Sequence, residues 1–184
     1  MKKQQRGYSL VEMLIVVAIV GVFSLIAVPQ FVRFYRQQQI RGSVRQFNSF
    51  MRAARSRAIK FQRPYGVAVA TQTTAAGPRG RYELLRGTIT SSSPLTITWA
   101  SAAGTEIGVP REKWLEETVQ FSDSAMEFNG GDGVYFLSNG TVGNMPDDGD
   151  PTIEIFSEAK VPNNHCTLTF TTVGNFKQTS TTVQ

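Results

Sequence analysis

The 184-residue sequence contains very few of the residues from which catalytic and metal sites are usually built. It has a single cysteine, Cys166, so no disulfide bond can form within the chain, and a single histidine, His165. It also lacks a Walker phosphate-binding loop, a serine nucleophile elbow and an HExxH zinc signature. The sequence therefore predicts a protein that is not an enzyme and has no cofactor.

Three polar features could serve as sites of chemistry, but each has a simpler structural interpretation. Cys166 begins the strand-like run CTLTFTTV and is interpreted as a small buried hydrophobe rather than a reactive thiol. His165 has no partner at the spacing of a metal ligand. The stretch PDDGDP at 146–151 offers carboxylates to Ca²⁺ but lacks the distal glutamate of a twelve-residue calcium loop. A solvated acidic turn is preferred there, and no metal is predicted.

Charge is absent from residues 9–28, with the exception of Glu12. A helix of this length measures about 30 Å, the thickness of the hydrocarbon core of a bilayer. An ionisable side chain in such a run is costly, so Glu12 is a candidate functional residue that needs a partner. Two structural explanations of a glutamate at position 12 stay open. Ser9 and Glu12 fit a capping box, and a glutamate in the first turn complements the helix dipole.

The N-terminal sequence KKQQRG-YSLVEMLIVVAIVGVFSLIAVP resembles the start of a type IV prepilin. Members of this family have a basic leader ending in glycine, then an aromatic first mature residue, and glutamate at the fifth mature position. Gly7, Tyr8 and Glu12 occupy these positions. The resemblance implies cleavage between Gly7 and Tyr8 by a prepilin peptidase, N-methylation of Tyr8, and pairing of Glu12 with the Tyr8 amine of a neighbouring subunit.

Two alternatives apply to this N-terminal segment. In a lone subunit Tyr8 and Glu12 are four residues apart, so their charges could pair along one helical face. Residues 1–28 could also be an ordinary secretory signal, although the apolar run is longer than usual and contains an acid.

The charge of the remaining chain is divided into a basic and an acidic part. Residues 30–63 contain nine basic side chains and no acid, whereas residues 64–184 contain seven basic and thirteen acidic ones, a net charge of −6. The arginines of 30–63 are interpreted as a solvated helix face, or alternatively as contacts to the acidic heads of neighbouring subunits.

Residues 30–63 also show helical periodicity, which predicts that one helix continues to about residue 62, before Pro64. Pro29 and Gly42 are predicted bend positions. The apolar stripe consists of Ile40, Val44, Phe47, Met51, Ala54, Ala58 and Phe61.

From residue 64 onward, short runs rich in β-branched and aromatic residues alternate with turn signals. Residues 111–117 are expected to form a short helix. The expected strands are 65–70, 81–87, 95–100, 118–121, 126–129, 133–137, 141–143, 152–156 and 166–173. A long N-terminal α-helix packed on an antiparallel, two-layer β-rich head is therefore predicted, an α+β fold.

Three segments, the first beginning in the predicted helix and the others in the head, resemble in order the H-type (GspH/FimT-like) minor pseudopilins: 50–69, 134–144 and 166–179. Gly140 and Gly174 are expected to supply turn geometry there. The resemblance implies a minor pilin or pseudopilin of α+β, type IV pilin-like fold, which primes or caps assembly of a type IV pilus or a type II secretion pseudopilus. It does not separate these two systems, and twitching motility is one function such a pilus could serve.

The same resemblance implies a division into leader (1–7), membrane and filament-core helix (8–28), amphipathic basic helix (29–63) and head (64–184). It implies a single-pass inner-membrane protein with a cytoplasmic N-terminus and a periplasmic head, placed after assembly at or near a filament tip. The implied partners are other major and minor pilins or pseudopilins, the prepilin peptidase, the inner-membrane assembly platform, and membrane lipid before assembly.

DNA binding in DNA uptake is the alternative function, because some FimT-like minor pilins bind DNA through a C-terminal Gly-Arg-x-Arg element. The sequence lacks this element near its C-terminus, and only GPRGR, with Arg79 and Arg81, resembles it elsewhere. The net negative charge of the head would repel phosphates, which makes nucleic acid a disfavoured partner.

Overall fold

The computed structural model describes residues 9–75, 77–93, 95–102, 112–122, 126–128, 131–144, 151–158 and 164–181. The chain divides into two compact units, Met1–Arg36 and Gln37–Gln184. One helix and ten strands are present in the described part. The predicted α+β class is confirmed.

The helix α1 extends over Leu10–Phe61 and contains both Pro29 and Gly42. It starts after Ser9, whose carbonyl accepts a hydrogen bond from the Met13 N–H (3.2 Å). No hydrogen bond joins Ser9 to Glu12 within the described residues, so the capping box, one of the two open explanations of Glu12, is not formed there.

The end of α1 at Phe61 agrees with the predicted end near residue 62. Gln62 follows with φ of 52°, in the left-handed region that terminates many helices. Pro64 then precedes the first strand and disfavours a helical conformation at the residue before it.

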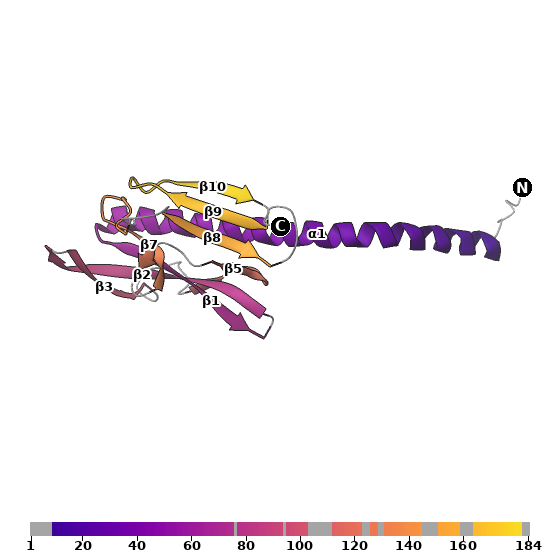
Figure 1. The fold of residues 1–184 in the computed structure, drawn as a ribbon, viewed down its shortest axis with the longest axis horizontal. Helices are drawn as coiled ribbons and strands as arrows, with labels where there is room; N and C mark the ends of the chain where they lie inside the picture. Colours follow the sequence, from indigo (N-terminus) through magenta and orange to yellow (C-terminus); the bar gives the residue numbers. More distant parts are fainter. Residues whose placement is uncertain are drawn as a thin grey trace, which may run out of the picture. The chain divides into compact units, whose positions relative to one another are not determined.

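Ten strands form two antiparallel sheets in the unit Gln37–Gln184. In the larger sheet the order is β3 (Leu95–Ser101), β2 (Gly77–Ser92), β1 (Tyr65–Thr74), β7 (Gly131–Phe136) and β6 (Glu127–Phe128), and β4 (Glu112–Trp114) pairs with β2. The smaller sheet has the order β10 (Phe176–Thr181), β9 (His165–Phe170), β8 (Thr152–Ser157) and β5 (Val119–Phe121). Figure 1 shows β9 and β10 along one side of the helix and β1 to β3 along the other.

Some expected elements of the head were wrong. Residues 112–114 form β4 instead of a short helix, because they pair with residues 81–83 of β2 and Glu112 forms an ion pair with Arg81 across the strands. The segment 141–143 contributes a single bridge at Val142. The strand expected at 166–173 ends at Phe170, since the following residues turn into β10, which the sequence did not predict.

The core is built around one face of α1. Six of the seven residues of the predicted apolar stripe are buried, together with Ser43 and Phe50, whereas Phe61 is 43% exposed because it lies at the helix end. The Phe47 ring forms T-shaped pairs with Tyr82 in β2 (5.3 Å between ring centroids) and with Phe121 in β5 (5.2 Å). Phe47 therefore joins the helix to both sheets.

Two buried side chains in this core, Cys166 and Tyr82, carry groups that can ionise. Cys166 in β9 is 1% exposed, and burial raises the pKa of its thiol, which agrees with its interpretation as a small hydrophobe. The Tyr82 hydroxyl is buried and has no hydrogen-bond partner among the described residues. Burial raises the pKa of Tyr82 because the phenolate would lose its hydration.

We predict that Tyr82→Phe raises the free energy of unfolding by about 1 kcal/mol, because a buried hydroxyl without a partner destabilises the fold. Above about pH 10 the Tyr82 phenol ionises in the unfolded chain but stays neutral in the folded state. The free energy of unfolding therefore falls as the pH rises through this range. Tyr82→Phe should reduce that alkaline loss. Denaturant titration of the full-length chain in detergent at pH 7 and pH 11 measures both effects, and a destabilised variant at pH 7 would contradict the prediction.

Candidate functional site

The first half of α1 exposes apolar side chains around its whole circumference. Every large apolar side chain from Leu10 to Tyr35 is at least 42% exposed, the lowest value being that of Val32. A continuous exposed apolar surface of this size is typical of a membrane or protein interface. By length and composition, α1 is the one helix in the described part of the chain that could cross a membrane.

Glu12 is the only charged side chain in this surface between Ser9 and Val28. It lies in the first turn of α1, is exposed, and has no hydrogen bond or ion pair to another described residue. Gly7 and Tyr8 lie outside the described residues, so the cleavage site and the pairing of Glu12 with the Tyr8 amine stay predictions. The bends predicted at Pro29 and Gly42 also stay predictions.

The second half of α1 carries basic side chains of two kinds. Arg41, Arg45, Arg52 and Lys60 are exposed and form no hydrogen bond or ion pair with other described residues. They fit the predicted solvated face. Arg55 is different because it is half-buried and held by the head.

The guanidinium of Arg55 joins two loops of the head to the helix. Its Nε donates to the carbonyl of Gly140 (3.1 Å), Nη1 to Oδ1 of Asn175 (2.9 Å) and Nη2 to the carbonyl of Val173 (2.7 Å). One loop follows β7 of the larger sheet, and the other connects β9 to β10 of the smaller sheet. Arg55 therefore links both sheets to α1.

The two loops that Arg55 holds have the same turn geometry. Gly140 donates to the carbonyl of Leu137 and Gly174 to that of Thr171, both at 2.8 Å. Both glycines have positive φ, 79° and 82°, which disfavours any side chain. A Cβ on Gly174 would also overlap the carbonyl oxygen of Gly140. The expectation that these glycines are turn residues is confirmed.

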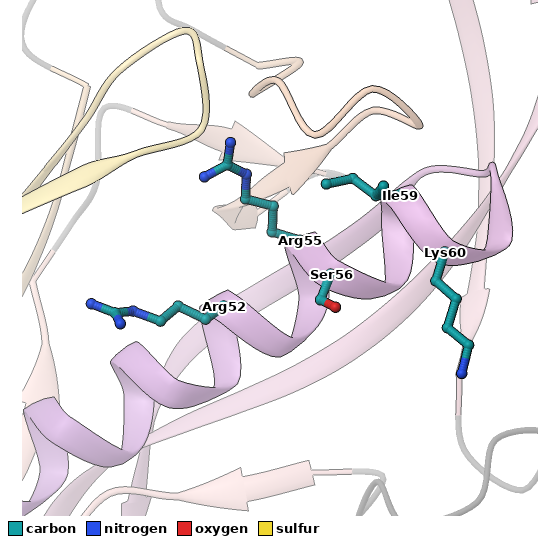
Figure 2. A pocket seen from close by; sticks show the side chains of 5 residues that line it. All are labelled: Arg52, Arg55, Ser56, Ile59 and Lys60. Carbon is teal, nitrogen blue, oxygen red and sulfur yellow. The ribbon is translucent and has the colours of Figure 1, made fainter.

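A shallow hollow of about 470 Å³ lies along the last turns of α1. It is lined by Arg52, Arg55, Ser56, Ile59 and Lys60 (Figure 2). Figure 2 shows Arg52 and Arg55 extended in the same general direction, with Lys60 directed away from them. Arg52 lies over the ring of Phe176 at 5.7 Å, so its cation is held in place without a carboxylate partner among the described residues.

The arginines considered for DNA binding are engaged within the head. The Nε of Arg79 donates to the carbonyl of Leu115, and its guanidinium lies 5.8 Å from the ring of Trp114. Arg81 pairs with Glu112 at 3.1 Å. Both therefore bind the segment around β4, and this arrangement gives the DNA interpretation no support.

Within the described residues, no group of three or more potential ligands is placed to hold a metal ion. His165 Nδ1 lies 3.7 Å from a carboxylate oxygen of Glu154, and its ring stacks on Phe156. Asp147, Asp148 and Asp150 of the predicted acidic turn lie outside the described residues.

Residues 2–28 match the family described as the prokaryotic N-terminal methylation motif. This match confirms the predicted resemblance to a type IV prepilin N-terminus. The chain is also 37% identical over 54 residues to a fimbrial protein of Pseudomonas aeruginosa, a stretch covering 29% of this chain and 35% of that protein. The alignment therefore spans about a third of the relative's length.

Two solved structures show a general likeness. The type IV minor pilin FimU of Pseudomonas aeruginosa is 15% identical with a TM-score of 0.47, over 78% of this chain and 90% of that one. The minor pseudopilin EpsH from the type II secretion system of Vibrio cholerae is 15% identical with a TM-score of 0.48, over 80% and 97% of the two chains. The methylation-motif match remains the comparison that bears on function.

We predict that Arg55→Lys lowers the free energy of unfolding by about 2–3 kcal/mol, because a lysine cannot donate to all three acceptors and hydrogen bonds to charged groups are strong. Arg52→Lys is the matched control: it keeps the charge, changes only the contact to Phe176, and should cost less than about 0.5 kcal/mol. Denaturant unfolding of the full-length chain measures both, and equal losses would show that Arg55 does not link the loops to the helix.

Proposed function

We propose that the chain is a structural subunit of a type IV pilin-like filament, of the minor pilin or pseudopilin type, without a catalytic role. The observation that carries this proposal is the N-terminal methylation motif at residues 2–28, which continues into an exposed apolar helix with a single carboxylate. An apolar surface on all sides of a helix suits burial first in lipid and then among the helices of neighbouring subunits.

Processing creates the partner that Glu12 lacks. Cleavage after Gly7 by a prepilin peptidase releases the α-amine of Tyr8, which is then N-methylated. An α-amine has a reference pKa of about 7.7–8.0, so it is largely cationic at neutral pH. In the filament core this cation pairs with the Glu12 carboxylate of an adjoining subunit.

The energetic scale supports a role for this pair in setting the register of assembly. A carboxylate inside a membrane helix costs up to about 3 kcal/mol, and less near the helix end. Two unit charges 4 Å apart attract by about 4 kcal/mol at an effective dielectric constant of 20. Helices that slide past one another would lose this attraction and leave two charges in an apolar core, so one register is favoured.

The proposed topology is a single pass through the inner membrane, with residues 1–7 as the cytoplasmic leader and residues 8–28 as the membrane segment. Residues 29–63 form the amphipathic basic helix, and the head 64–184 lies in the periplasm. Lipid surrounds the apolar helix before assembly, and an inner-membrane assembly platform transfers the subunit to other pilins or pseudopilins. We propose that it primes or caps the filament, at or near the tip.

Two systems use this N-terminus, the type IV pilus and the type II secretion pseudopilus. The proteins that co-purify with the chain from membranes, identified by mass spectrometry, assign it to one of them. Arg79 and Arg81 are bound within the head, and no other observation favours the DNA-uptake alternative.

We predict that Glu12→Ala leaves processing intact but lowers incorporation into filaments at least about tenfold, because the Tyr8 amine would then be buried without a partner, a loss of about 3–5 kcal/mol. Gly7→Ala should leave residues 1–7 on the chain. Intact-mass measurement reports processing, and immunoblotting of sheared filaments reports incorporation.

Ser9→Ala is the control for these two variants. It removes the hydroxyl of the residue just before α1 and leaves Glu12 in place. It should be processed and incorporated like the parent chain. Normal incorporation of Glu12→Ala would contradict the proposed role of the carboxylate, and an equal loss for Ser9→Ala would assign the effect to the helix start.

A further inference from the structure

Two adjoining hollows form one groove beside α1 in the unit Gln37–Gln184. One, of about 410 Å³, lies between α1 and the start of β10. The other, of about 470 Å³, follows the last turns of α1 (Figure 2). Arg52 and Arg55 line both hollows, which are therefore the two ends of a single groove, called here the helix groove. Its other lining residues include Met51, Phe136, Phe176, Ser56, Ile59 and Lys60.

The helix groove holds two cations close together. Arg52 and Arg55 are three residues apart on α1, so they are neighbours on the helix surface, with Cβ atoms about 5–6 Å apart. Both guanidiniums extend to the start of β10: that of Arg52 lies 5.7 Å from the ring centroid of Phe176, and that of Arg55 donates to Oδ1 of Asn175 (2.9 Å). No carboxylate of the described residues forms an ion pair with either arginine. A bound anion would relieve the repulsion between these two cations.

Both guanidiniums are oriented and still have donors to offer. Arg55 donates three hydrogen bonds, all to neutral oxygens, so its charge is not cancelled. A guanidinium carries five N–H donors, which leaves two on Arg55. Arg52 donates to no described residue, and its contact with the Phe176 ring holds it in place. Side chains held in this way lose little conformational entropy on binding, and guanidiniums are well suited to carboxylates.

The length and the walls of the helix groove suit a peptide better than a single small ion. The part of α1 that lines it, residues 51–60, extends over about 13 Å, which is the length of about four residues of extended chain. Apolar surface flanks the two cations: the partly buried ring of Phe176 lies at one end and the exposed side chain of Ile59 at the other. The groove therefore offers apolar contacts on both sides of its positive centre.

The charge of the head favours a carboxylate over a polyphosphate in this groove. Residues 64–184 carry a net charge of −6, which repels a nucleic acid with its row of phosphates. A single carboxylate brings one negative charge and two acceptor oxygens, which the free donors of Arg52 and Arg55 can bind. The ligand that matches the groove is thus a short peptide with one carboxylate next to an apolar side chain.

We propose that the helix groove binds an extended segment of another protein, which carries a carboxylate beside an apolar side chain. The carboxylate accepts hydrogen bonds from Arg52 and Arg55, and the apolar side chain packs on Phe176. This inference rests on the proposed function, because a subunit that primes or caps a filament must contact different subunits. It names one surface of the head for such a contact and the chemistry of the segment that fits it.

Peptide binding to the full-length chain in a neutral detergent tests this inference. The probe is a tetrapeptide that alternates phenylalanine and aspartate and carries an uncharged fluorescent dye, and anisotropy reports its binding. We expect saturable binding that Arg52→Gln weakens at least about tenfold. Arg41→Gln is the matched control, because it removes the same charge from an exposed arginine of α1 outside the groove, and it should leave the Kd unchanged. A probe with asparagine in place of aspartate should bind at least about tenfold more weakly.

A second variant tests the groove without changing its charge. Ser56 is exposed and lines the groove, so Ser56→Phe should fill it and weaken binding of the aspartate probe at least about tenfold. Ser49→Phe is the control, because Ser49 is exposed on nearly the same side of α1, two turns earlier and outside the groove. Denaturant unfolding of each variant confirms that the head is folded.

Several results would overturn the inference. These are an absence of saturable binding, an equal loss in Arg41→Gln, and equal binding of the asparagine probe. Displacement of the probe by inorganic phosphate or by short-chain phosphatidylglycerol at lower concentrations than by unlabelled peptide would assign the groove to a phosphate or to a lipid headgroup instead. Binding that appears only after Asp147, Asp148 and Asp150 are replaced by asparagine would show that the chain's own carboxylates fill the groove.

The same protein preparations separate this inference from the proposed function. N-terminal sequencing reports whether Tyr8 is the methylated first residue, and shearing of the cells reports whether the chain enters filaments. A chain that passes both tests but does not bind the aspartate probe contradicts this inference and leaves the proposed function intact. A chain that retains its leader contradicts the proposed function, whatever the result of the peptide binding.

Discussion

A single helix provides two different apolar surfaces, and this division is the constraint on which the rest of the protein depends. From Leu10 to Val28 the helix exposes apolar side chains on all sides and carries one charge, Glu12, so it needs lipid or other helices around it. From Ile40 to Ala58 only one stripe is apolar, and the two sheets cover it. The change in pattern marks the point where the exposed apolar half of the helix ends and the half that forms the core of the head begins.

The head uses the helix as its central support. Phe47 contacts an aromatic ring in each sheet, and Arg55 binds the loop after β7 as well as the loop between β9 and β10. The sheets are therefore joined to one another through α1 in addition to their own contacts.

The parts of this structure that depend on local pattern could be predicted from the sequence, and those that depend on distant partners could not. The helix end, the buried stripe and the two glycine turns follow from periodicity, a proline and the conformational freedom of glycine. By contrast, Glu112 to Trp114 form a strand only because β2 lies beside them. Arg55 looks like any other arginine of its helix, and only its position at the edge of the stripe, next to Ala54, hints at its contacts with loops more than eighty residues away.

The proposed function assigns the negative charge of Glu12 to pairing with a positive charge that processing would produce close to it. Intact-mass analysis and N-terminal sequencing of the native protein recovered from cells test this requirement most directly. We predict a chain that begins at an N-methylated Tyr8 and retains the whole apolar helix. A chain that still begins at Met1, or one cut beyond residue 28, would contradict the account, because no amine would then exist where Glu12 needs it.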